Sequence, residues 1–409
     1  MPEAAKSEEP LPRLKLTLRP TAESIVRGGH PWVYSDSIRK QNREGEAGEI
    51  AVLYDRKDKF LALGFYDPDS PLRVRILHLG KPVKLDEDWW LSKLMETQSR
   101  RDSIPDSGTN GLRLINGESD GWPGLVMDRY DGTLVVKVYT AAWIKLMEML
   151  LPIFIETLKP ERVVLRLSRN LQALSSASGG PGDGSVLHGT SPEGVVTFLE
   201  NGVRFEADVL KGQKTGFFLD QRENRKRVGE LSEGRDVLNA FSFSGGFSLY
   251  AAKGGAKSVT DLDISAHALE AAERNFALNH DDGGVAACEH RCEQDDAFKW
   301  IETAKSSSYD VVIVDPPSLA KREVERGRAI QAYAKLNANA IRLLRPHGVL
   351  VAASCSAHVS ESEFYDAVRT AARQSGRSFK EMETRGHALD HKAKFPEAHY
   401  LKCIYLQFE

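Results

Sequence analysis

The residues with the clearest chemical potential stand at the ends of two apolar runs. "VVIVDPPSLAKR" ends its run on Asp315 and two prolines, and "GVLVAASCSAHVS" ends its run on Cys355 between two serines. A cysteine attacks only as the thiolate, so Cys355 as a nucleophile needs an electropositive or hydrogen-bonded setting. Taken alone, it is equally well explained as a small apolar residue where a strand leaves the core. Asp315, beside a rigid loop, suits binding or protonating a flat heterocycle.

A glycine-rich turn follows another apolar run, in "NAFSFSGGFSLYAA". Gly245 and Gly246 would let the backbone pass close to a ligand, although a plain tight turn is the alternative. The segment is not a G-x-G-x-x-G fingerprint and lacks the lysine of a P-loop. A nicotinamide or nucleoside-triphosphate site is therefore disfavoured.

Acidic residues end two further runs, "TDLDIS" and "EQDDAFKWI". An acid at the end of a second parallel strand is well placed to accept hydrogen bonds from a ribose diol. Asp263 is the better candidate because it comes last before the helix, and Asp261 is held in reserve. Asp295 or Asp296 could accept from an exocyclic amine such as that of adenine, and N-capping of the next helix explains them equally well.

The segment "KGQKTGFFLDQRENRKR", residues 211–227, combines six Lys and Arg with two phenylalanines. Cations neutralise phosphates and flat rings stack on bases, so this composition is typical of a nucleic-acid groove. The solvated start of a helix is the alternative. Gln221 or Arg222 could instead reach a carboxylate of a ligand.

These residues need a scaffold that gathers strand ends at one edge. From about residue 194 onward, apolar strands alternate with helical segments, which predicts a parallel sheet with helices on both faces. Ligands bind such sheets outside the carboxyl ends of the strands. The acids, the glycine turn and Cys355 are therefore expected to meet at one edge.

The preceding chain has a different rhythm. Residues 14–82 read as short strands between Gly, Asp and Pro, with 13 Lys and Arg against 9 Asp and Glu between residues 11 and 81. A second block, about residues 84–192, contains helical patterns and Asn-Gly or Asp-Gly turn signals. Near its end, "SSASGGPGDGS" is predicted to be a flexible linker.

Length and composition limit the function classes. The chain has 409 residues, 41% of them hydrophobic, and a net charge of −3, as expected of a globular protein whose nucleic-acid contacts are local. No apolar run approaches the roughly 20 residues of a membrane helix, so no membrane association is expected. The first dozen residues read as a disordered tail and not a signal peptide. Four cysteines do not make a disulfide framework, which favours a cytoplasmic location.

One cluster of metal-binding residue types is present. "ACEHRC" places Cys288, His290 and Cys292 at alternate positions. A spacing of two along one strand is not a usual zinc pattern, so a plain strand is the better explanation and no metal site is expected.

In this order, the segments resemble the large-subunit (23S) ribosomal RNA methyltransferase I family, whose members use S-adenosylmethionine to make 5-methylcytosine. The match spans nearly all of residues 14–409. Its most specific segments are "HPWVYSDSI", "GESDGWPGLVMDRY", "KTGFFLDQRENR", "LNAFSFSGGFSLYAA", "VDPPSLA", "SCSAHVS" and "FPEAHYLKC".

The resemblance implies an α/β fold with a C-terminal Rossmann-like class I methyltransferase domain. A β-rich PUA-type RNA-binding barrel and a small α+β linking domain would precede it. The expected boundaries are a tail at 1–12, the PUA-type domain at 13–83, the central domain at 84–193 and the methyltransferase domain at 194–409. The implied partner is ribosomal RNA, free or in an assembling large subunit, and a homodimer is one alternative for the oligomeric state.

The resemblance also implies roles for individual residues. Cys355 would attack the base and Asp315 would face it, while Asp263 would hold the cofactor ribose and Asp296 its adenine. The other cofactor-binding residues expected are Asp220, Gln221, Arg222, Asn239, Phe241, Gly245 and Gly246. The expected RNA-binding residues are Lys211, Lys214, Arg225, Lys226 and Arg227.

Cytosine chemistry explains why a thiol is wanted. C5 of cytosine is too weakly nucleophilic to take a methyl group unaided, and adding a thiolate to C6 activates it. An exocyclic amine target, as in a guanine-modifying relative, would need no cysteine. The chain departs from many RNA cytosine methyltransferases at Pro317, where they carry a second Cys, and at Ser318–Leu319, where a bulkier residue is common. A non-catalytic RNA-binding assembly factor is a further alternative.

Overall fold

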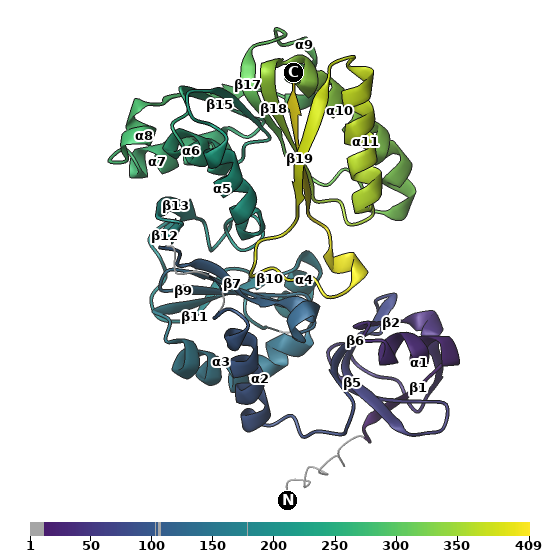
Figure 1. Cartoon of the computed structure of the whole chain (residues 1–409). Coiled ribbons are helices and arrows are strands. Elements are labelled where there is room, and N and C mark those ends of the chain that lie inside the picture. Colours follow the sequence, from purple (N-terminus) through teal and green to yellow (C-terminus); the bar gives the residue numbers. More distant parts are fainter. Residues whose placement is uncertain (1–11, 103, 105–107, 178) are drawn as a thin grey trace, which may run out of the picture. The chain divides into compact units, whose positions relative to one another are not determined.

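The computed structural model describes residues 12–102, 104, 108–177 and 179–409 (Figure 1). Within this part, two compact units are distinguished. One comprises residues 12–102, 114–127 and 134–191, and the other comprises 104, 108–113, 128–133 and 192–409. The expected tail at 1–12 lies outside the described residues except for Pro12. The domain boundaries expected from the sequence remain predictions.

The N-terminal strands form a six-stranded sheet in the order β2-β6-β5-β4-β1-β3. Alternation buries Leu14, Leu16 and Leu18 of β1 completely, whereas the lysine between the first two points outward. β1 runs parallel to β4, whereas the pairs β1–β3, β2–β6, β4–β5 and β5–β6 are antiparallel. The elements are β1 (Leu14–Leu18), α1 (Pro20–Arg27), β2 (Trp32–Tyr34), η1 (Ser35–Ser37), β3 (Ile38–Gln41), β4 (Ile50–Tyr54), β5 (Phe60–Tyr66) and β6 (Leu72–Leu79).

A five-stranded sheet in the order β11-β10-β9-β8-β7 follows. Its core includes three mutually contacting, fully buried indoles, those of Trp90, Trp122 and Trp143. The elements are α2 (Glu87–Ser99), β7 (Gly111–Asn116), η2 (Gly117–Asp120), β8 (Leu125–Tyr130), β9 (Thr133–Val138), α3 (Ala142–Leu158), β10 (Arg162–Leu167), α4 (Arg169–Ala177) and β11 (Ser185–His188).

The segment predicted to be a flexible linker is tied down in its described residues. Its first residues belong to α4, and the Asp183 carboxylate accepts hydrogen bonds from the Arg166 side chain and from the Leu167 amide at 2.7 Å. The part-buried pair between Arg166 and Asp183 thus fixes one point of this segment, and the flexibility of the remainder stays a prediction.

The C-terminal unit contains a hairpin that turns at Asn201–Gly202, formed by β12 (Val196–Glu200) and β13 (Val203–Ala207). A seven-stranded sheet follows, in the order β16-β15-β14-β17-β18-β20-β19. Its strands are β14 (Asp236–Ala240), β15 (Ser258–Asp263), β16 (Glu289–Gln294), β17 (Tyr309–Val314), β18 (Leu344–Ser354), β19 (Phe379–Arg385) and β20 (Lys402–Phe408). Its helices are η3 (Leu219–Gln221), α5 (Arg222–Glu230), α6 (Gly246–Lys253), α7 (Ala266–Leu278), α8 (Gly283–Ala287), α9 (Ala297–Thr303), η4 (Glu323–Glu325), α10 (Arg326–Arg342), α11 (Glu361–Gln374) and η5 (Pro396–Ala398).

The first five strands of this sheet are parallel, as the alternation of strands and helices predicts. The sheet then ends in a way that the alternation does not predict. After α11 the chain forms β19 at the edge and returns as β20 between β18 and β19, antiparallel to both (Figure 1). An antiparallel return needs no crossover helix, so the helical rhythm gives no sign of it.

Register fixes which strand ends meet. Ala240 of β14 pairs with Leu262 of β15 and with Val314 of β17, and Val314 pairs with Ala352 of β18. The carboxyl ends of these four strands therefore lie at one edge of the sheet. Among the described residues, no helix combines the length and the apolar character that crossing a bilayer requires.

Candidate active site

The turn after β14 contains polar atoms that lack a protein partner. Asn239 Oδ1, Ser242 Oγ and Ser244 Oγ are buried and form no hydrogen bond within the described part of the chain. Unpaired buried polar atoms are unfavourable and therefore mark places where a ligand completes the bonding. Phe241 and Phe243 have left-handed φ angles of 62° and 48°, a strain concentrated at functional turns. This turn is shaped for a polar ligand.

The two glycines of this turn are required by their neighbours. Gly245 has a φ of 72°, and a Cβ there would lie 2.8 Å from the Ala272 Cβ and 2.9 Å from Asp261 Oδ2. A Cβ on Gly246 would lie 2.9 Å from Arg225 Cδ. Close packing of the turn against α7 and α5 therefore accounts for both glycines. Their predicted contact with a cofactor is an additional role that stays a prediction.

Asp261, the reserve candidate for the ribose, has no exposed surface. Its carboxylate accepts hydrogen bonds from Asn239 Nδ2 at 2.9 Å and Ser248 Oγ at 2.6 Å. His290 Nε2 lies 2.9 Å from its other oxygen, and Cys292 Sγ lies 3.7 Å from that nitrogen. The three potential ligand atoms of Asp261, His290 and Cys292 all lie within 4.8 Å of one another. Hydrogen bonds between the adjacent strands β14, β15 and β16 account for this grouping.

Asp263, the preferred ribose candidate, lies on the rim and is partly exposed. Its two oxygens accept from the backbone amides of Phe243 and Ser265, each at 2.9 Å, so the carboxylate is held in place beside the glycine turn. Asp296 is also partly exposed and N-caps α9, with Oδ1 accepting from the Phe298 amide at 3.0 Å. Both carboxylates keep lone pairs for a ligand, since each oxygen can accept two hydrogen bonds.

Asp315 follows β17 and is partly buried. Gln221 Nε2 donates to Asp315 Oδ2 at 2.8 Å, and Gln221 Oε1 accepts from Asn224 Nδ2 at 2.6 Å, which orients the amide. Burial, together with the negative charge of Asp220, raises the pKa of Asp315 to about 6. Near neutral pH this carboxyl group therefore exists in both its proton-donating and its proton-accepting form.

Cys355 follows β18 and is partly exposed at the same edge. Its thiol donates to the Pro316 carbonyl at 3.9 Å, which brings Cys355 against the loop that carries Asp315. Burial, together with the Asp315 carboxylate, raises the pKa of the thiol to about 11. The sulfur is therefore a thiol in the free protein. The structure places the two residues singled out for chemistry on neighbouring loops.

Asp220 lies buried beside this pair. Its Oδ2 accepts from Lys214 Nζ at 2.8 Å and from the Tyr400 hydroxyl at 2.6 Å, while Oδ1 is buried without a partner. Although burial opposes its ionisation, Lys214 and the neighbouring hydrogen bonds hold the pKa of Asp220 well below its usual range. A buried, ionised carboxylate with one free oxygen fits a cationic group of a ligand.

Two arginines of the 211–227 segment are buried in ion pairs. Arg222 is 3% exposed and pairs with Asp390 through two hydrogen bonds of 3.0 and 3.1 Å. Arg225 is also 3% exposed and pairs with the fully buried Glu200 at 2.6 and 2.8 Å. These pairs occupy both side chains, which disfavours an RNA contact by Arg225, and the two roles expected from the sequence stay predictions. Local composition cannot reveal partners so distant in the chain.

The other basic residues of that segment differ in accessibility. Lys211 and Lys226 are exposed, and Lys214 is half-buried by its contact with Asp220. Arg227 is partly exposed and pairs with Glu383 and Glu230. Lys211 and Lys226 are therefore the members of this segment best placed to meet a phosphate backbone.

The sequence analysis did not identify the residues that join the loop carrying Asp315 to the loop carrying Cys355. The Ser356 hydroxyl accepts from the backbone amides of Leu319 and Ala320 at 3.0 and 3.3 Å, and the Tyr333 hydroxyl lies 2.8 Å from it. The loop after β17 is thereby fastened to the loop after β18. The signal was the second serine of "SCS", which on its own looks like an ordinary polar residue.

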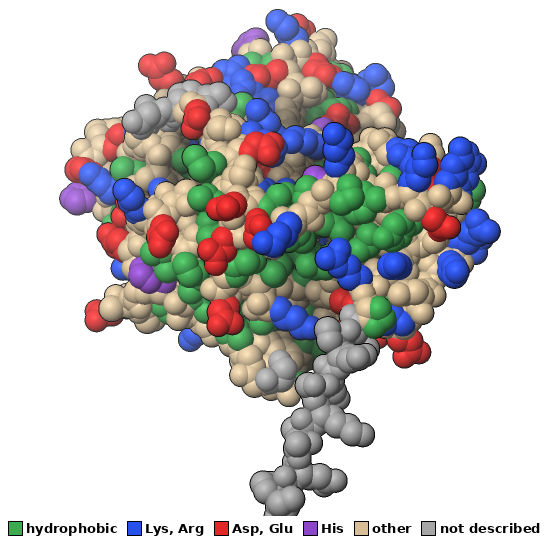
Figure 2. All heavy atoms as spheres, turned by 90° about the horizontal axis from the view of Figure 1, so that it is seen from below, with side chains coloured by type: hydrophobic (Ala, Val, Ile, Leu, Met, Phe, Trp, Pro, Cys, Tyr) green, Lys and Arg blue, Asp and Glu red, His purple; other side chains and the backbone are tan. Residues whose placement is uncertain are grey.

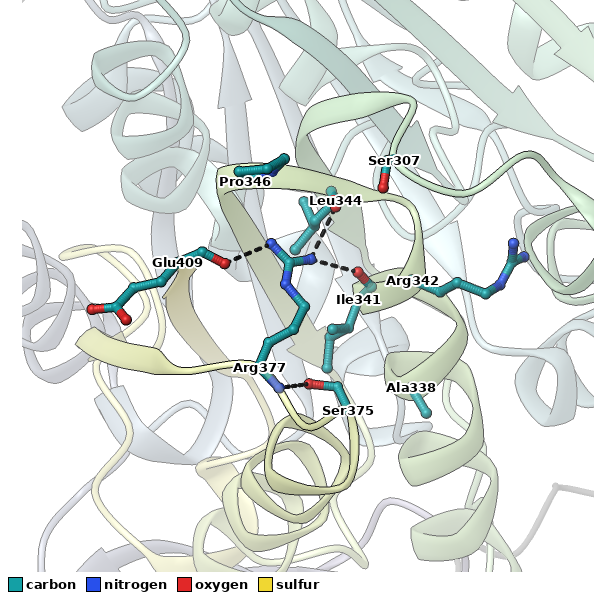
Figure 3. Close-up of a pocket in the computed structure, with 9 residues that line it drawn as sticks. All are labelled: Ser307, Ala338, Ile341, Arg342, Leu344, Pro346, Ser375, Arg377 and Glu409. Atoms are coloured by element: carbon teal, nitrogen blue, oxygen red, sulfur yellow. Dashed lines mark hydrogen bonds between the residues drawn. The ribbon is translucent and has the colours of Figure 1, made fainter.

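A separate pocket lies at the opposite end of β18 (Figure 3). Arg377 occupies it and donates to the backbone carbonyls of Ile341, Leu344 and Glu409 at 3.3, 2.9 and 3.3 Å. The guanidinium thereby links the C-terminal end of α10, the start of β18 and the backbone of Glu409. This pocket serves the fold and is not the candidate active site.

Comparison with known proteins agrees with this geometry. Residues 136–386 match the family described as S-adenosylmethionine-dependent methyltransferase, and residues 16–79 match a PUA-like domain. A ribosomal RNA large subunit methyltransferase of Deinococcus radiodurans is 55% identical over 97% of this chain and 98% of its own. The chain belongs to this family.

A ribosomal RNA large subunit methyltransferase I of Aliivibrio fischeri is 34% identical over 93% of this chain and 96% of its own. Among solved structures, the methyltransferase SMU.776 in complex with S-adenosylhomocysteine superposes with a TM-score of 0.81 at 21% identity, covering 96% and 99% of the two chains. At that identity the likeness concerns the fold. The PUA-like domain and the Rossmann-like methyltransferase domain predicted from the sequence are confirmed.

S-adenosylmethionine is the cofactor of the family, and the site fits it. Its ammonium, carboxylate, ribose and adenine groups need both hydrogen-bond donors and acceptors. The unpaired oxygens of Asp220, Asn239, Ser242 and Ser244, with Asp263 nearby, supply acceptors at the ends of β14 and β15. The prediction that the cofactor is S-adenosylmethionine is confirmed. The contacts of individual residues with this cofactor stay predictions.

Proposed function

We propose that the protein transfers a methyl group from S-adenosylmethionine to C5 of a cytosine in large-subunit ribosomal RNA, through an adduct between Cys355 and C6. The observation that carries this proposal is the contact between the Cys355 thiol and the Pro316 carbonyl. It brings a nucleophile and the proton-donating Asp315 together at the carboxyl ends of two adjacent strands. Methyl transfer to an amine would give this thiol no task.

In the reaction, Asp315 binds the base and Cys355 activates it. The protonated form of Asp315 donates to N3 of cytosine, which draws electrons from the ring as the thiolate adds to C6. C5 becomes nucleophilic as a result. The bound cofactor supplies a methyl group on a sulfonium, which leaves as the thioether. The protons of the Cys355 thiol and of C5 pass to solvent water. Loss of the C5 proton expels the thiolate from C6 and restores the ring, and the N3 proton returns to Asp315.

The acidities of the two side chains suit this division of labour. Asp315, with a pKa of about 6, is protonated often enough near neutral pH to act as an acid. Cys355, with a pKa of about 11, must lose its proton as the base docks. A poorly ionised thiol in the free enzyme is protected from oxidation, because the thiolate is the oxidisable form.

The other residues of the site are assigned to the cofactor. We assign the turn from Phe241 to Gly246, with Asn239, to its methionine part, and the free oxygen of Asp220 to its ammonium group. Asp263 would accept from the ribose hydroxyls and Asp296 from the adenine amine. Gln221 would act indirectly, by orienting Asp315.

Ribosomal RNA is the proposed partner, as in the named relatives. The PUA-like domain and the exposed Lys211 and Lys226 support RNA binding. Figure 2 shows Lys and Arg side chains gathered toward one side of a face that also exposes hydrophobic side chains. Such a mixture suits RNA, whose phosphates and bases need different contacts. A cytoplasmic location and a homodimeric state stay predictions.

The test is to purify ribosomal RNA from cells lacking the protein and to identify its nucleosides by mass spectrometry. Loss of one 5-methylcytosine, restored by the wild type and not by Cys355→Ala, is the expected result. Loss of a methylguanosine would instead identify an amine-directed enzyme. Calorimetry that detects no binding of S-adenosylmethionine would favour a non-catalytic assembly factor.

A further inference from the structure

Lys402 is a buried cation close to the nucleophile. It is the first residue of β20 and has no exposed surface. Its partner in the antiparallel ladder is Ser354, the residue directly before Cys355. The side chain thus begins beside the strand end that delivers the thiol.

The ammonium of Lys402 is bound by the loop that carries Cys355. Its Nζ donates to the carbonyl oxygens of Ser356 and Val359, each at 2.6 Å. These two bonds span the turn between β18 and α11. They hold the backbone immediately after Cys355 in place. The Ser356 hydroxyl provides a further tie, because it accepts from the Leu319 amide.

No carboxylate of the described residues forms an ion pair with Lys402. Glu361 and Glu363 favour its charged form less than Cys355 does, and Glu363 is committed to Arg326 and to the capping of α11 by Ser360. A buried ammonium without a counter-ion is unfavourable unless something repays its desolvation. Burial lowers the pKa of Lys402 to about 8, and Cys355 is the group that opposes this shift most.

The thiolate form of Cys355 needs a nearby positive charge. The carboxylates of Asp315 and Asp220 disfavour the thiolate, and the neutral Tyr400 hydroxyl lies close to them. Lys214 favours the thiolate but is bound to Asp220. Among the described groups that act on the thiol, Lys402 is the cation with no anionic partner of its own.

We propose that Lys402 is a positioning residue that holds the Cys355 loop through two backbone carbonyls and is the counter-ion of the Cys355 thiolate. The proposal rests on the covalent mechanism given above. The positive charge of the Lys402 ammonium would offset the carboxylates of Asp315 and Asp220, which disfavour the thiolate. In the free protein the cation is held in the core by the two loop carbonyls, and the thiolate that forms as the base docks becomes its anionic partner.

The test compares Lys402→Gln, which can still donate to a carbonyl but has no charge, with Lys402→Met, which does neither. Lys380→Gln, at an exposed position on neighbouring β19, is the matched control. Alkylation of Cys355 by iodoacetamide is followed against pH by peptide mass spectrometry, which separates it from the other three cysteines. Circular dichroism and melting verify folding.

We expect both Lys402 variants to be alkylated about tenfold more slowly than the wild type below about pH 8, where Lys402 carries its charge, corresponding to a loss of about one unit of thiol acidity. The Lys380→Gln variant should match the wild type. A Lys402→Gln profile that also matches the wild type would overturn the proposal, because hydrogen bonding alone would then suffice. Alkylation needs no RNA, so the result is independent of which nucleotide the enzyme modifies.

A second measurement does not depend on Lys402 variants folding. In Cys355→Asp, whose carboxylate stands in for the thiolate, the Lys402 side chain should lose its proton at a higher pH than in the wild type, read from the ¹³Cε resonance of labelled lysine. Coupling between two groups is reciprocal, so the shift must appear on both. An unchanged lysine titration would refute the pairing. If instead Cys355→Ala still made 5-methylcytosine, the proposed function would fail while this pairing could stand.

Discussion

The side-chain amide of Gln221 donates to the Asp315 carboxylate at 2.8 Å and is itself held by Asn224 at 2.6 Å. This bond stabilises the ionised form of Asp315 and so limits the rise of its pKa. Gln221→Leu should therefore raise the Asp315 pKa. Because the protonated form is the proposed acid, the descending alkaline limb of kcat should move to higher pH. The exposed Gln213→Leu is the control, and superimposable pH profiles would argue against the acid role.

Asp315 should oppose folding at alkaline pH. Its native pKa of about 6 exceeds the unfolded value, so the stability tied to its proton is present at low pH and is lost as pH rises toward and through 6. Asp315→Asn should stabilise the protein by about 1–3 kcal/mol at pH 8 and by little at pH 4. Methylation should fall by about 10²-fold or more. Denaturant titrations at both pH values check the sign, which a purely packing effect would not show.

The packing of Gly245 can be separated from its φ angle. Gly245 and Gly376 share a φ of 72°, but a Cβ at Gly376 would meet nothing within 4 Å. Gly376→Ala should cost about 1 kcal/mol, the strain of left-handed backbone alone. Gly245→Ala adds a clash with Ala272 and should cost about 2 kcal/mol more. Equal melting temperatures for the two variants would show that the turn at Gly245 shifts enough to avoid the clash with Ala272.

Arg225 and Lys226 are neighbours with opposite expected phenotypes. Arg225→Gln leaves the buried Glu200 carboxylate unpaired and should cost about 3–5 kcal/mol in stability. Lys226→Gln should leave stability within about 0.5 kcal/mol. It should instead weaken RNA binding and lower the slope of log affinity against log salt by about one. Filter binding across salt concentrations and melting curves check this. A stable Arg225→Gln with weakened RNA binding, or a destabilised Lys226→Gln, would contradict the prediction.

The Ser356 hydroxyl should matter more than that of Tyr333. Ser356→Ala removes the acceptor of two backbone amides and should cost about 2–3 kcal/mol, whereas Tyr333→Phe removes one hydroxyl and should cost about 1 kcal/mol. Loosening the loop after β17 should lower kcat in Ser356→Ala while the affinity for S-adenosylmethionine stays unchanged. A proportional loss of cofactor affinity would place the loop in the cofactor site instead.

Local pattern predicted the parallel strands and the convergence of their ends. Apolar runs closed by Asp263, Asp315 and Cys355 identify both the strands and the chemical edge, because parallel strands end together. The same reasoning preferred Asp263 over Asp261, and the buried hydrogen-bonded state of Asp261 agrees with that order.

What escaped prediction depends on partners far apart in the chain. Arg222 and Asp390 are 168 residues apart, so nothing near Arg222 indicates that its charge is used internally. Lys402 in "YLKC" looks like an exposed lysine at a strand start until β20 is placed beside β18. Composition sets average behaviour, whereas these side chains owe their roles to individual tertiary contacts.

The place of β20 between β18 and β19 has a consequence for how the enzyme is made. The last seven-residue strand, Lys402–Phe408, is an interior member of the sheet, and β19 has no neighbour until it arrives. During synthesis the sheet of the catalytic unit therefore stays incomplete until Lys402–Phe408 has left the ribosome. A chain that stops before Lys402 would lack both the strand and the lysine that binds the Cys355 loop. Methylation would thus be confined to chains in which this strand has been made.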